Sequence, residues 1–100
     1  MGLVEVCKVA DVKAGKGKTV KANGKQIAVF NAGGKFYAID NTCLHRGGPL
    51  GEGALSGDTV TCGWHGWQYD VSTGACKTNP GAKAQSYKVN VDGDKLMVEV

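Results

Sequence analysis

The sequence predicts an all-β fold for its 100 residues. Short runs of alternating apolar and polar residues recur along the chain, which is the pattern of half-buried strands. Turn residues, above all the 16 glycines, separate these runs. No window shows the apolar period of about 3.6 residues that marks an amphipathic helix. Strands joined by tight turns are therefore the expected architecture.

Four strands are expected in the N-terminal part of the chain. They lie at residues 3–8, 18–22, 26–30 and 35–39, and the turn at 11–17 begins with a single helical turn. Asn23-Gly24 and Gly33-Gly34 each join two of these strands. Such pairs are strong hairpin signals because their central positions need positive φ. We therefore expect antiparallel pairing of these neighbours.

The C-terminal part repeats the pattern, with strands at 87–91 and 95–100 on either side of a turn at 92–94. Between the two β blocks, residues 41 to about 80 hold both Trp, both His, both Pro and three of the four Cys. Only short strands, near 58–61 and 67–70, are expected there.

The chain divides accordingly. We predict one domain, residues 1–100, with a β base formed by 1–40 and 81–100. An inserted subdomain at about 41–80 is built mainly from loops, and it carries the chemistry.

Length and composition exclude several classes of protein. One hundred residues make about one domain, too few for an α/β barrel or a two-domain oxygenase. No apolar run approaches the ~18–20 residues of a membrane span, and the N-terminus lacks the features of a secretory signal. The net charge of +3 is too small to argue for nucleic acid. We expect neither a membrane nor a nucleic-acid partner.

The charges are unevenly distributed. The segment 41–70 sets Arg46 against Glu52, Asp58 and Asp70, while six lysines lie between Lys8 and Lys25. The favoured interpretation of these lysines is a solvated strand edge that resists edge-to-edge aggregation. A docking face for an acidic partner is the alternative.

The chemistry-bearing motif consists of two Cys/His pairs. Cys43-x-His45 is followed, after 16 residues, by Cys62-x-x-His65. Two thiolates and two imidazoles on two loops are a typical metal-binding set. A single zinc ion usually has wider spacing within each pair. A [2Fe–2S] rhombus is longer, and the type that has mixed ligands binds two Cys on one iron and two His on the other. The spacing favours the cluster, and a structural zinc module is the alternative.

These loops resemble those of the Rieske iron–sulfur family, specifically its small ferredoxins. The resemblance rests on the sequences Cys43-x-His45-Arg46-Gly47-Gly48-Pro49-Leu50 and Cys62-x-Trp64-His65-Gly66-Trp67-x-Tyr69-Asp70. It implies stacked antiparallel sheets with a cluster-binding subdomain at one tip. It also implies that Cys43 and Cys62 bind one iron and that His45 and His65 bind the other.

The resemblance assigns further residues to the surroundings of the cluster. Pro80 lies where the family has a third, proline-containing loop, and Gly47 and Gly66 allow close backbone approach. Tyr69 occupies the position of a hydroxyl donor to a ligand thiolate, and Trp67 replaces a serine found in high-potential members. Leu44, Pro49 and Trp64 form an expected apolar collar for partner docking.

Departures from the family pattern exclude the respiratory subfamily. Gly48 and Trp64 occupy the positions where respiratory members of the family have a disulfide. Cys7 and Cys76 lie outside both loops, and we expect reduced thiols in the cytoplasm, although a disulfide between them is the alternative.

The resemblance implies a monomeric electron carrier without catalysis of its own. It would pass electrons from an NAD(P)H-dependent flavin reductase to a terminal aromatic-ring-hydroxylating oxygenase. The alternative is the small Rieske subunit of an assimilatory NADH-nitrite reductase. The chain is not expected to be the oxygenase, because both histidines are already used as cluster ligands and none remains for a mononuclear iron site.

Overall fold

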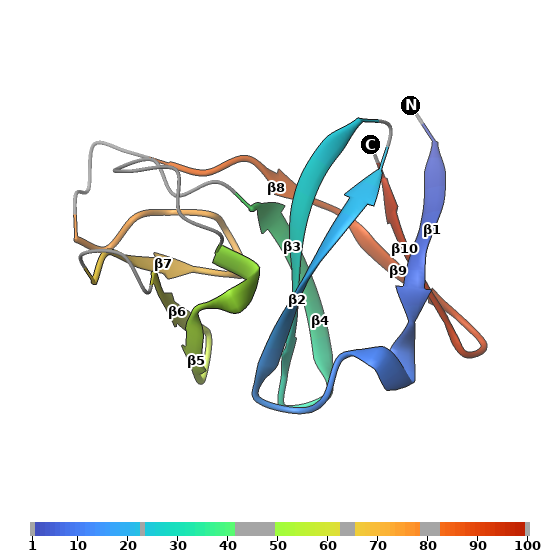
Figure 1. Ribbon diagram of the computed structural model, residues 1–100, viewed down its shortest axis with the longest axis horizontal. Helices are drawn as coiled ribbons and strands as arrows, with labels where there is room; N and C mark the ends of the chain where they lie inside the picture. The colour runs from blue at the N-terminus through green and yellow to red at the C-terminus, as the bar shows by residue number, and fades with distance from the viewer. Residues whose placement is uncertain (1, 23, 42–49, 63–65, 79–82, 100) are drawn as a thin grey trace.

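The computed structural model describes residues 2–22, 24–41, 50–62, 66–78 and 83–99. Figure 1 shows their arrangement. The elements, in chain order, are β1 (Leu3–Lys8), η1 (Val9–Asp11), β2 (Lys16–Ala22), β3 (Lys25–Ala32), β4 (Lys35–Asp40), η2 (Leu50–Glu52), β5 (Ala54–Ser56), β6 (Thr59–Thr61), β7 (Gln68–Asp70), β8 (Ser86–Tyr87), β9 (Val89–Asp92) and β10 (Lys95–Glu99). The prediction of an all-β fold is confirmed.

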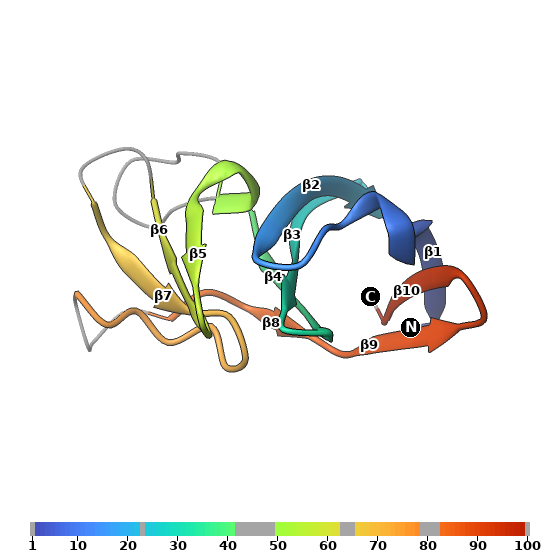
Figure 2. The same cartoon turned by 90° about the horizontal axis from the view of Figure 1, so that it is seen from below.

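Within the described ranges, the strands form three antiparallel sheets. Their orders are β1-β10-β9, β2-β3-β4-β8 and β5-β6-β7. Figures 1 and 2 show the four-stranded sheet in the middle, with the small β5-β6-β7 sheet on one side and β1-β10-β9 on the other. The resemblance implied stacked antiparallel sheets, and this arrangement agrees with that expectation.

The central sheet separates two hydrophobic cores. Alternate residues of β3 face opposite sides, since side chains alternate along a strand. Ala28 and Phe30 enter a core that the central sheet shares with the small sheet. This first core cluster consists of Ala28, Phe30, Ile39, Leu50, Val60, Cys62, Tyr69, Val71, Cys76 and Ala84. Ile27 and Val29 enter a core on the other face of the central sheet. This second core cluster consists of Val12, Val20, Ala22, Ile27, Val29, Ala38, Leu96 and Val98. All four of these β3 side chains are fully buried, so β3 is apolar on both faces.

Tight turns set the register of the central sheet. Ala22 pairs with Lys25, so two residues join β2 to β3. Ala32 pairs with Lys35, so Gly33 and Gly34 join β3 to β4. Their φ angles of 65° and 97° lie in the left-handed region, which explains why glycine occupies both positions.

The lysine-rich strand lies at an edge. β2 is the outermost strand of the central sheet, and Lys16, Lys18 and Lys21 on it are exposed. This placement agrees with the interpretation of these lysines as protection of a sheet edge.

The structure differs from the predicted elements in three places. The predicted strand 87–91 is divided at Lys88, because β8 pairs with β4 whereas β9 pairs with β10. The expected helical turn occurs as a 3-10 turn at Val9–Asp11, slightly earlier than predicted. The short elements η2 and β5 were not predicted. Within the described ranges, no helix is long and apolar enough to cross a membrane.

Candidate metal centre

Cys62 is held at one end of the small sheet. β6 ends at Thr61, which pairs with Gln68, the first residue of β7. One residue further toward the loop, the Cys62 N–H donates to the Trp67 carbonyl oxygen at 2.7 Å. Cys62 itself is 1% exposed. The loop that carries the second Cys/His pair therefore has a base fixed by strand pairing.

Side chains near Cys62 point toward the same core. Cys62, Tyr69 and Cys76 all belong to the first core cluster, and Trp67 packs against it. Tyr69 is fully buried and pairs with Val60 on β6. Because residues two apart on a strand share a face, Trp67 and Tyr69 lie on the side of the hairpin that Cys62 faces.

The base of the first ligand loop lies at the same end of the sheet. β4 ends at Asp40, and the described chain resumes at Leu50, whose N–H donates to the Asn41 carbonyl oxygen at 2.6 Å. A Cβ at Gly53 would lie 2.4 Å from the carbonyl oxygen of Thr61, so the chain leaving this loop passes directly beside the end of β6.

The residues that flank segment 79–82 lie near the same end of the small sheet. The Gln68 N–H donates to the Thr78 hydroxyl oxygen at 2.9 Å, and the Lys77 N–H donates to the Gln68 carbonyl oxygen at 2.7 Å. The chain returns at Lys83, which forms an isolated bridge with Ala75. The segment 79–82, which holds the predicted proline loop, therefore starts beside the first residue of β7.

Four of the predicted site residues fall within the described part of the chain. They are Cys62, Gly66, Trp67 and Tyr69, and Gly66 has a φ of 73°. The others lie outside the described residues, namely Cys43, Leu44, His45, Gly47, Pro49, Trp64, His65 and Pro80. The structure brings together the described residues that flank the segments 42–49, 63–65 and 79–82.

The donor set fits a Rieske cluster. Cys43, His45, Cys62 and His65 lie on two loops whose bases adjoin the end of β6, and one of the four, Cys62, is a buried thiol beside apolar side chains. Each predicted loop holds one Cys and one His, so together they could supply two Cys to one iron and two His to the other.

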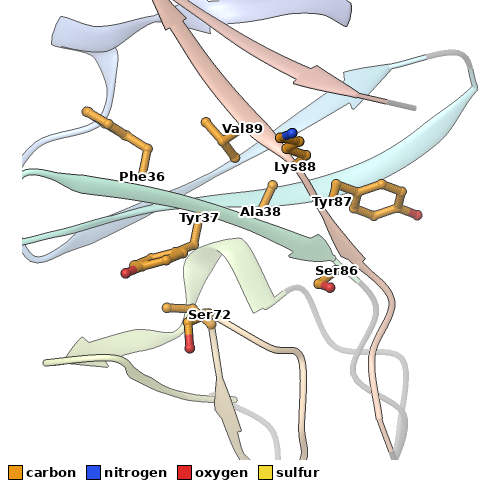
Figure 3. A pocket seen from close by; sticks show the side chains of 9 residues that line it. Phe36, Tyr37, Ala38, Ser72, Ser86, Tyr87, Lys88 and Val89 are labelled. Atoms are coloured by element: carbon orange, nitrogen blue, oxygen red, sulfur yellow. The ribbon is translucent and has the colours of Figure 1, made fainter. Parts of the chain in front are cut away.

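A separate hollow of about 420 Å³ lies elsewhere (Figure 3). It is formed by β4, the β8–β9 segment and the turn after β7. Its lining residues are Phe36, Tyr37, Ala38, Val71, Ser72, Ser86, Tyr87, Lys88 and Val89. Among the residues that the structure describes, its lining does not include Cys62, the one predicted ligand that can be placed. Val71 donates to the Asp58 carbonyl oxygen, which places this turn at the end of the small sheet opposite to Cys62.

The two cysteines outside the motif do not form a disulfide. Cys7 carries a free, partly buried thiol that packs against the second core cluster, whereas Cys76 belongs to the first core cluster across the central sheet. Burial, and after it the nearby Asp11 carboxylate, raises the pKa of the Cys7 thiol. A thiol of raised pKa is a weaker nucleophile at neutral pH, which fits a structural role.

Several residues at the loop bases were not predicted from the sequence. Asn41, Thr19, Gly51 and Thr78 form hydrogen bonds at these bases or pack against them. Asn41, Gly51 and Thr78 lie next to these segments in the sequence, which was the available signal, whereas Thr19 lies on a distant strand. Their hydrogen-bond partners are distant in the chain, so the sequence alone did not identify them.

Comparison with known proteins identifies the family. Residues 2–96 match the family described as the Rieske [2Fe-2S] domain. The ferredoxin component of the naphthalene 1,2-dioxygenase/salicylate 5-hydroxylase systems of Ralstonia sp is 33% identical over 91 residues. That alignment covers 90% of this chain and 88% of the relative. The chain therefore belongs to the Rieske [2Fe-2S] family, and its cofactor is a Rieske [2Fe–2S] cluster.

Solved structures agree with this assignment. The ferredoxin of Sphingomonas yanoikuyae B1 superimposes with a TM-score of 0.90 at 29% identity, over 99% of both chains. A chain in the complex of reduced oxygenase and oxidised ferredoxin of carbazole 1,9a-dioxygenase gives a TM-score of 0.87 at 32% identity. That match covers 96% of this chain and 91% of the other.

Two other similarities have a narrower meaning. Apoptosis-inducing factor 3 of Homo sapiens is 32% identical over 94 residues. The match covers 93% of this chain but only 16% of that much longer protein. A protein described as a nitrite reductase NADPH small subunit superimposes over all of both chains with a TM-score of 0.86. Its 18% identity supports the shared fold alone.

Proposed function

We propose that this protein is a one-electron carrier. Its cluster would be held by Cys43 and Cys62 on one iron and by His45 and His65 on the other. The observation that carries the proposal is that the described residues at the bases of the two predicted ligand loops lie at one end of the small sheet, with Cys62 buried at that end. When bound, such a cluster takes up and releases one electron.

The described residues around Cys62 have a supporting role in this function. Apolar packing by Tyr69, Trp67 and Leu50 excludes water from the buried side of the centre. Exclusion of water and hydrogen bonds to the sulfurs are the protein's means of tuning a reduction potential. Tyr69 is the described residue best placed for this, because it is fully buried and shares its core cluster with Cys62.

The ferredoxin relatives support the proposed electron acceptor. We propose a terminal aromatic-ring-hydroxylating oxygenase as the acceptor and an NAD(P)H-dependent flavin reductase as the donor. The dioxygenase ferredoxin relative and the carbazole dioxygenase complex support the acceptor. The chain acts as an electron-transfer component, and we propose that it works as a cytoplasmic monomer. The division into a base, 1–40 and 81–100, and a cluster-binding subdomain, about 41–80, belongs to the same proposal.

Contact with these partners would use the cluster tip. Leu44, Pro49 and Trp64 belong to the ligand loops, so a partner bound there lies close to the histidine ligands. The exposed lysines of β2 belong to a different part of the molecule, at the outer edge of the central sheet. We propose that the tip, rather than the lysine edge, forms the transient interface.

A spectroscopic and chemical analysis tests the cofactor assignment. The purified protein should be red-brown, with two irons and two sulfides per chain and the rhombic electron paramagnetic resonance signal of a reduced Rieske centre. Stoichiometric zinc without visible absorption would refute the assignment.

A reconstitution assay tests the physiological role. NADH, a dioxygenase reductase and the terminal oxygenase should turn over aromatic substrate only when this protein is added. The competing assignment, a permanent nitrite reductase subunit, predicts instead a stable complex with the large subunit during gel filtration and no stimulation of the oxygenase.

A further inference from the structure

Asn41 and Asn31 are the buried polar side chains of the described chain, and Asn41 is only 3% exposed. Asn41 is the last described residue before the segment 42–49, which holds Cys43 and His45. We propose that Asn41 is a positioning residue that fixes the base of this segment and thereby holds two cluster ligands in place. The inference depends on the cluster ligands given in the proposed function.

Both ends of the segment meet on this one residue. The backbone carbonyl of Asn41 accepts a hydrogen bond from the Leu50 N–H at 2.6 Å. Its side-chain oxygen Oδ1 accepts a second bond from the Gly51 N–H at 2.8 Å. The entrance and the exit of the segment are thus joined by two bonds, one through the backbone and one through the side chain.

Asn41 is itself attached to the central sheet. Its N–H donates to the Gln26 carbonyl oxygen on β3 at 3.2 Å. The Thr19 hydroxyl on β2 donates to Asn41 Oδ1 at 3.0 Å. Oδ1 therefore accepts two hydrogen bonds, one from β2 and one from the end of the segment. This oxygen connects the end of the segment to the central sheet.

The backbone at this base packs closely against β2. A Cβ added at Gly51 would lie 2.5 Å from Thr19 Oγ1 and 2.8 Å from the Thr19 nitrogen. Leu50, beside it, is fully buried in the first core cluster. The exit of the segment is therefore pressed against β2 at the point where Thr19 reaches Asn41.

Removal of Oδ1 would leave two donors, the Gly51 N–H and the Thr19 hydroxyl, without their acceptor. Such a loss acts on the ligands through the loop base, without any contact between Asn41 and the cluster. Residues that orient metal ligands typically change metal affinity about 10–100-fold when they are replaced. A purely structural role would instead lower thermal stability and leave the properties of the loaded cluster unchanged.

Asn31 provides a matched control. Its Nδ2 donates to the Val12 carbonyl oxygen at 2.9 Å, and its Oδ1 accepts from the Gly34 N–H at 2.8 Å. Asn31→Ala therefore removes two side-chain hydrogen bonds of a buried asparagine. Asn31 lies near the end of β3, whereas Ile27, near the start of β3, pairs with Asp40, the neighbour of Asn41. A comparable loss of stability is expected from both Asn→Ala variants.

The experiment compares cluster-loaded Asn41→Ala and Asn31→Ala proteins with the wild type. Three quantities are measured: melting temperature, the rate of iron release to bathophenanthroline disulfonate, and the g values of the reduced cluster. For Asn41→Ala we expect iron release to be about 10–100-fold faster, together with shifted g values. For Asn31→Ala we expect a lower melting temperature with wild-type g values. Equal iron release and unchanged g values in both variants would overturn the proposal.

A second pair of variants keeps the test decisive if Asn41→Ala does not fold. Thr19 is exposed on an edge strand, so Thr19→Val preserves its shape and strand preference while removing the hydroxyl donor. We expect Thr19→Val to accelerate iron release, and Thr19→Ser, which keeps the hydroxyl, to restore the wild-type rate. Equal rates for Thr19→Val and Thr19→Ser would overturn the proposal. Absence of a [2Fe–2S] cluster from the wild-type protein would instead refute the proposed function.

Discussion

The N–H of Cys62 donates to the carbonyl oxygen of Trp67 across 2.7 Å. This bond extends the β6–β7 pairing by one residue pair beyond Thr61 and Gln68. Cys62 is therefore positioned by the geometry of a sheet, and its side chain enters the first core cluster together with Tyr69. The relationship fixes the backbone at one of the four proposed ligands.

Replacement of a histidine ligand by cysteine should lower the reduction potential. With two neutral imidazoles the oxidised cluster carries no net charge, and an added thiolate makes uptake of an electron less favourable. We expect His45→Cys and His65→Cys each to shift the potential down by on the order of 100 mV. Protein film voltammetry measures the shift. Ser56→Cys, which adds an exposed thiol on β5, is the control and should leave the potential unchanged. A rise in the potential of either ligand variant would contradict this electrostatic account.

Tyr69→Phe should lower the potential by a smaller amount. If the hydroxyl donates to a cluster sulfur more strongly in the reduced state by about 1 kcal/mol, its loss corresponds to ~40 mV for one electron. The buried ring remains in place in this variant, so the melting temperature should change little. Tyr37→Phe is the control, because Tyr37 packs against the same core cluster from β4. Equal potentials for the two variants would show that the Tyr69 hydroxyl has no influence on the cluster.

Gly74→Ala should be among the most destabilising single substitutions in this chain. Gly74 has a φ of 84°, and a Cβ there would lie 2.1 Å from the carbonyl oxygen of Ala84. The left-handed conformation costs about 1–2 kcal/mol for a residue with a Cβ, and the clash adds to this. Gly57→Ala is the control, since its φ of 59° carries the conformational cost alone and nothing lies within 4 Å. Denaturant unfolding should show clearly the greater loss for Gly74→Ala, and equal losses would contradict the clash.

Tyr87 should make the stability depend on pH in the alkaline range. Its hydroxyl donates to Asp40 Oδ1 at 2.6 Å, and burial, followed by the Asp40 carboxylate, raises the pKa of Tyr87 to about 12. The folded state therefore favours the neutral phenol. Its contribution to stability is complete below the unfolded pKa of about 10 and is lost as the pH rises to about 12.

Denaturant unfolding at pH 8 to 12 checks this dependence. Tyr87→Phe should be less stable than wild type at pH 8, and the difference should shrink as the pH rises. Tyr37→Phe serves as the control, and its free energy of unfolding should fall between pH 8 and pH 12 by as much as that of the wild type. A difference between Tyr87→Phe and wild type that stays constant from pH 8 to pH 12 would contradict the assigned titration.

Electron transfer to the oxygenase should depend on the tip rather than on the lysine edge. We expect Leu44→Asp and Trp64→Ala to slow transfer while leaving the potential nearly unchanged. Replacement of Lys16, Lys18 and Lys21 by Glu should have a smaller effect. Stopped-flow kinetics with reduced protein and oxidised oxygenase measure the rates. Loss of transfer in the lysine variant, with normal rates in the tip variants, would assign the interface to β2.

Most of the base was predictable because its signals are local. Alternation gave β1 with its observed bounds, and the two-residue turns gave the β2–β3 and β3–β4 hairpins. The division at Lys88 was not predictable, since alternation continues across it. The chain changes sheets there, and that change depends on pairing with β4 and β10, which are distant in the sequence.

The site was predictable in its chemistry but not in its support. Ligand types and spacing are visible in the sequence, and so are Trp67 and Tyr69. The supporting contacts join residues that are far apart along the chain, as when Thr19 on β2 reaches Asn41. No local pattern distinguishes Asn41 from an ordinary loop asparagine, because its role depends on the sheet beneath it.

The two-faced burial of β3 has a consequence for folding. Ile27 and Val29 belong to one core and Ala28 and Phe30 to the other, so a slip of one residue would exchange the two sets. Phe30 would then have to fit where smaller side chains pack, and both cores would be disrupted at once. The strand therefore has a single acceptable register. It also links the two cores, because the same strand supplies buried side chains to both. We expect a displacement of β3 on the side away from Cys62 to disturb the packing on the ligand side as well.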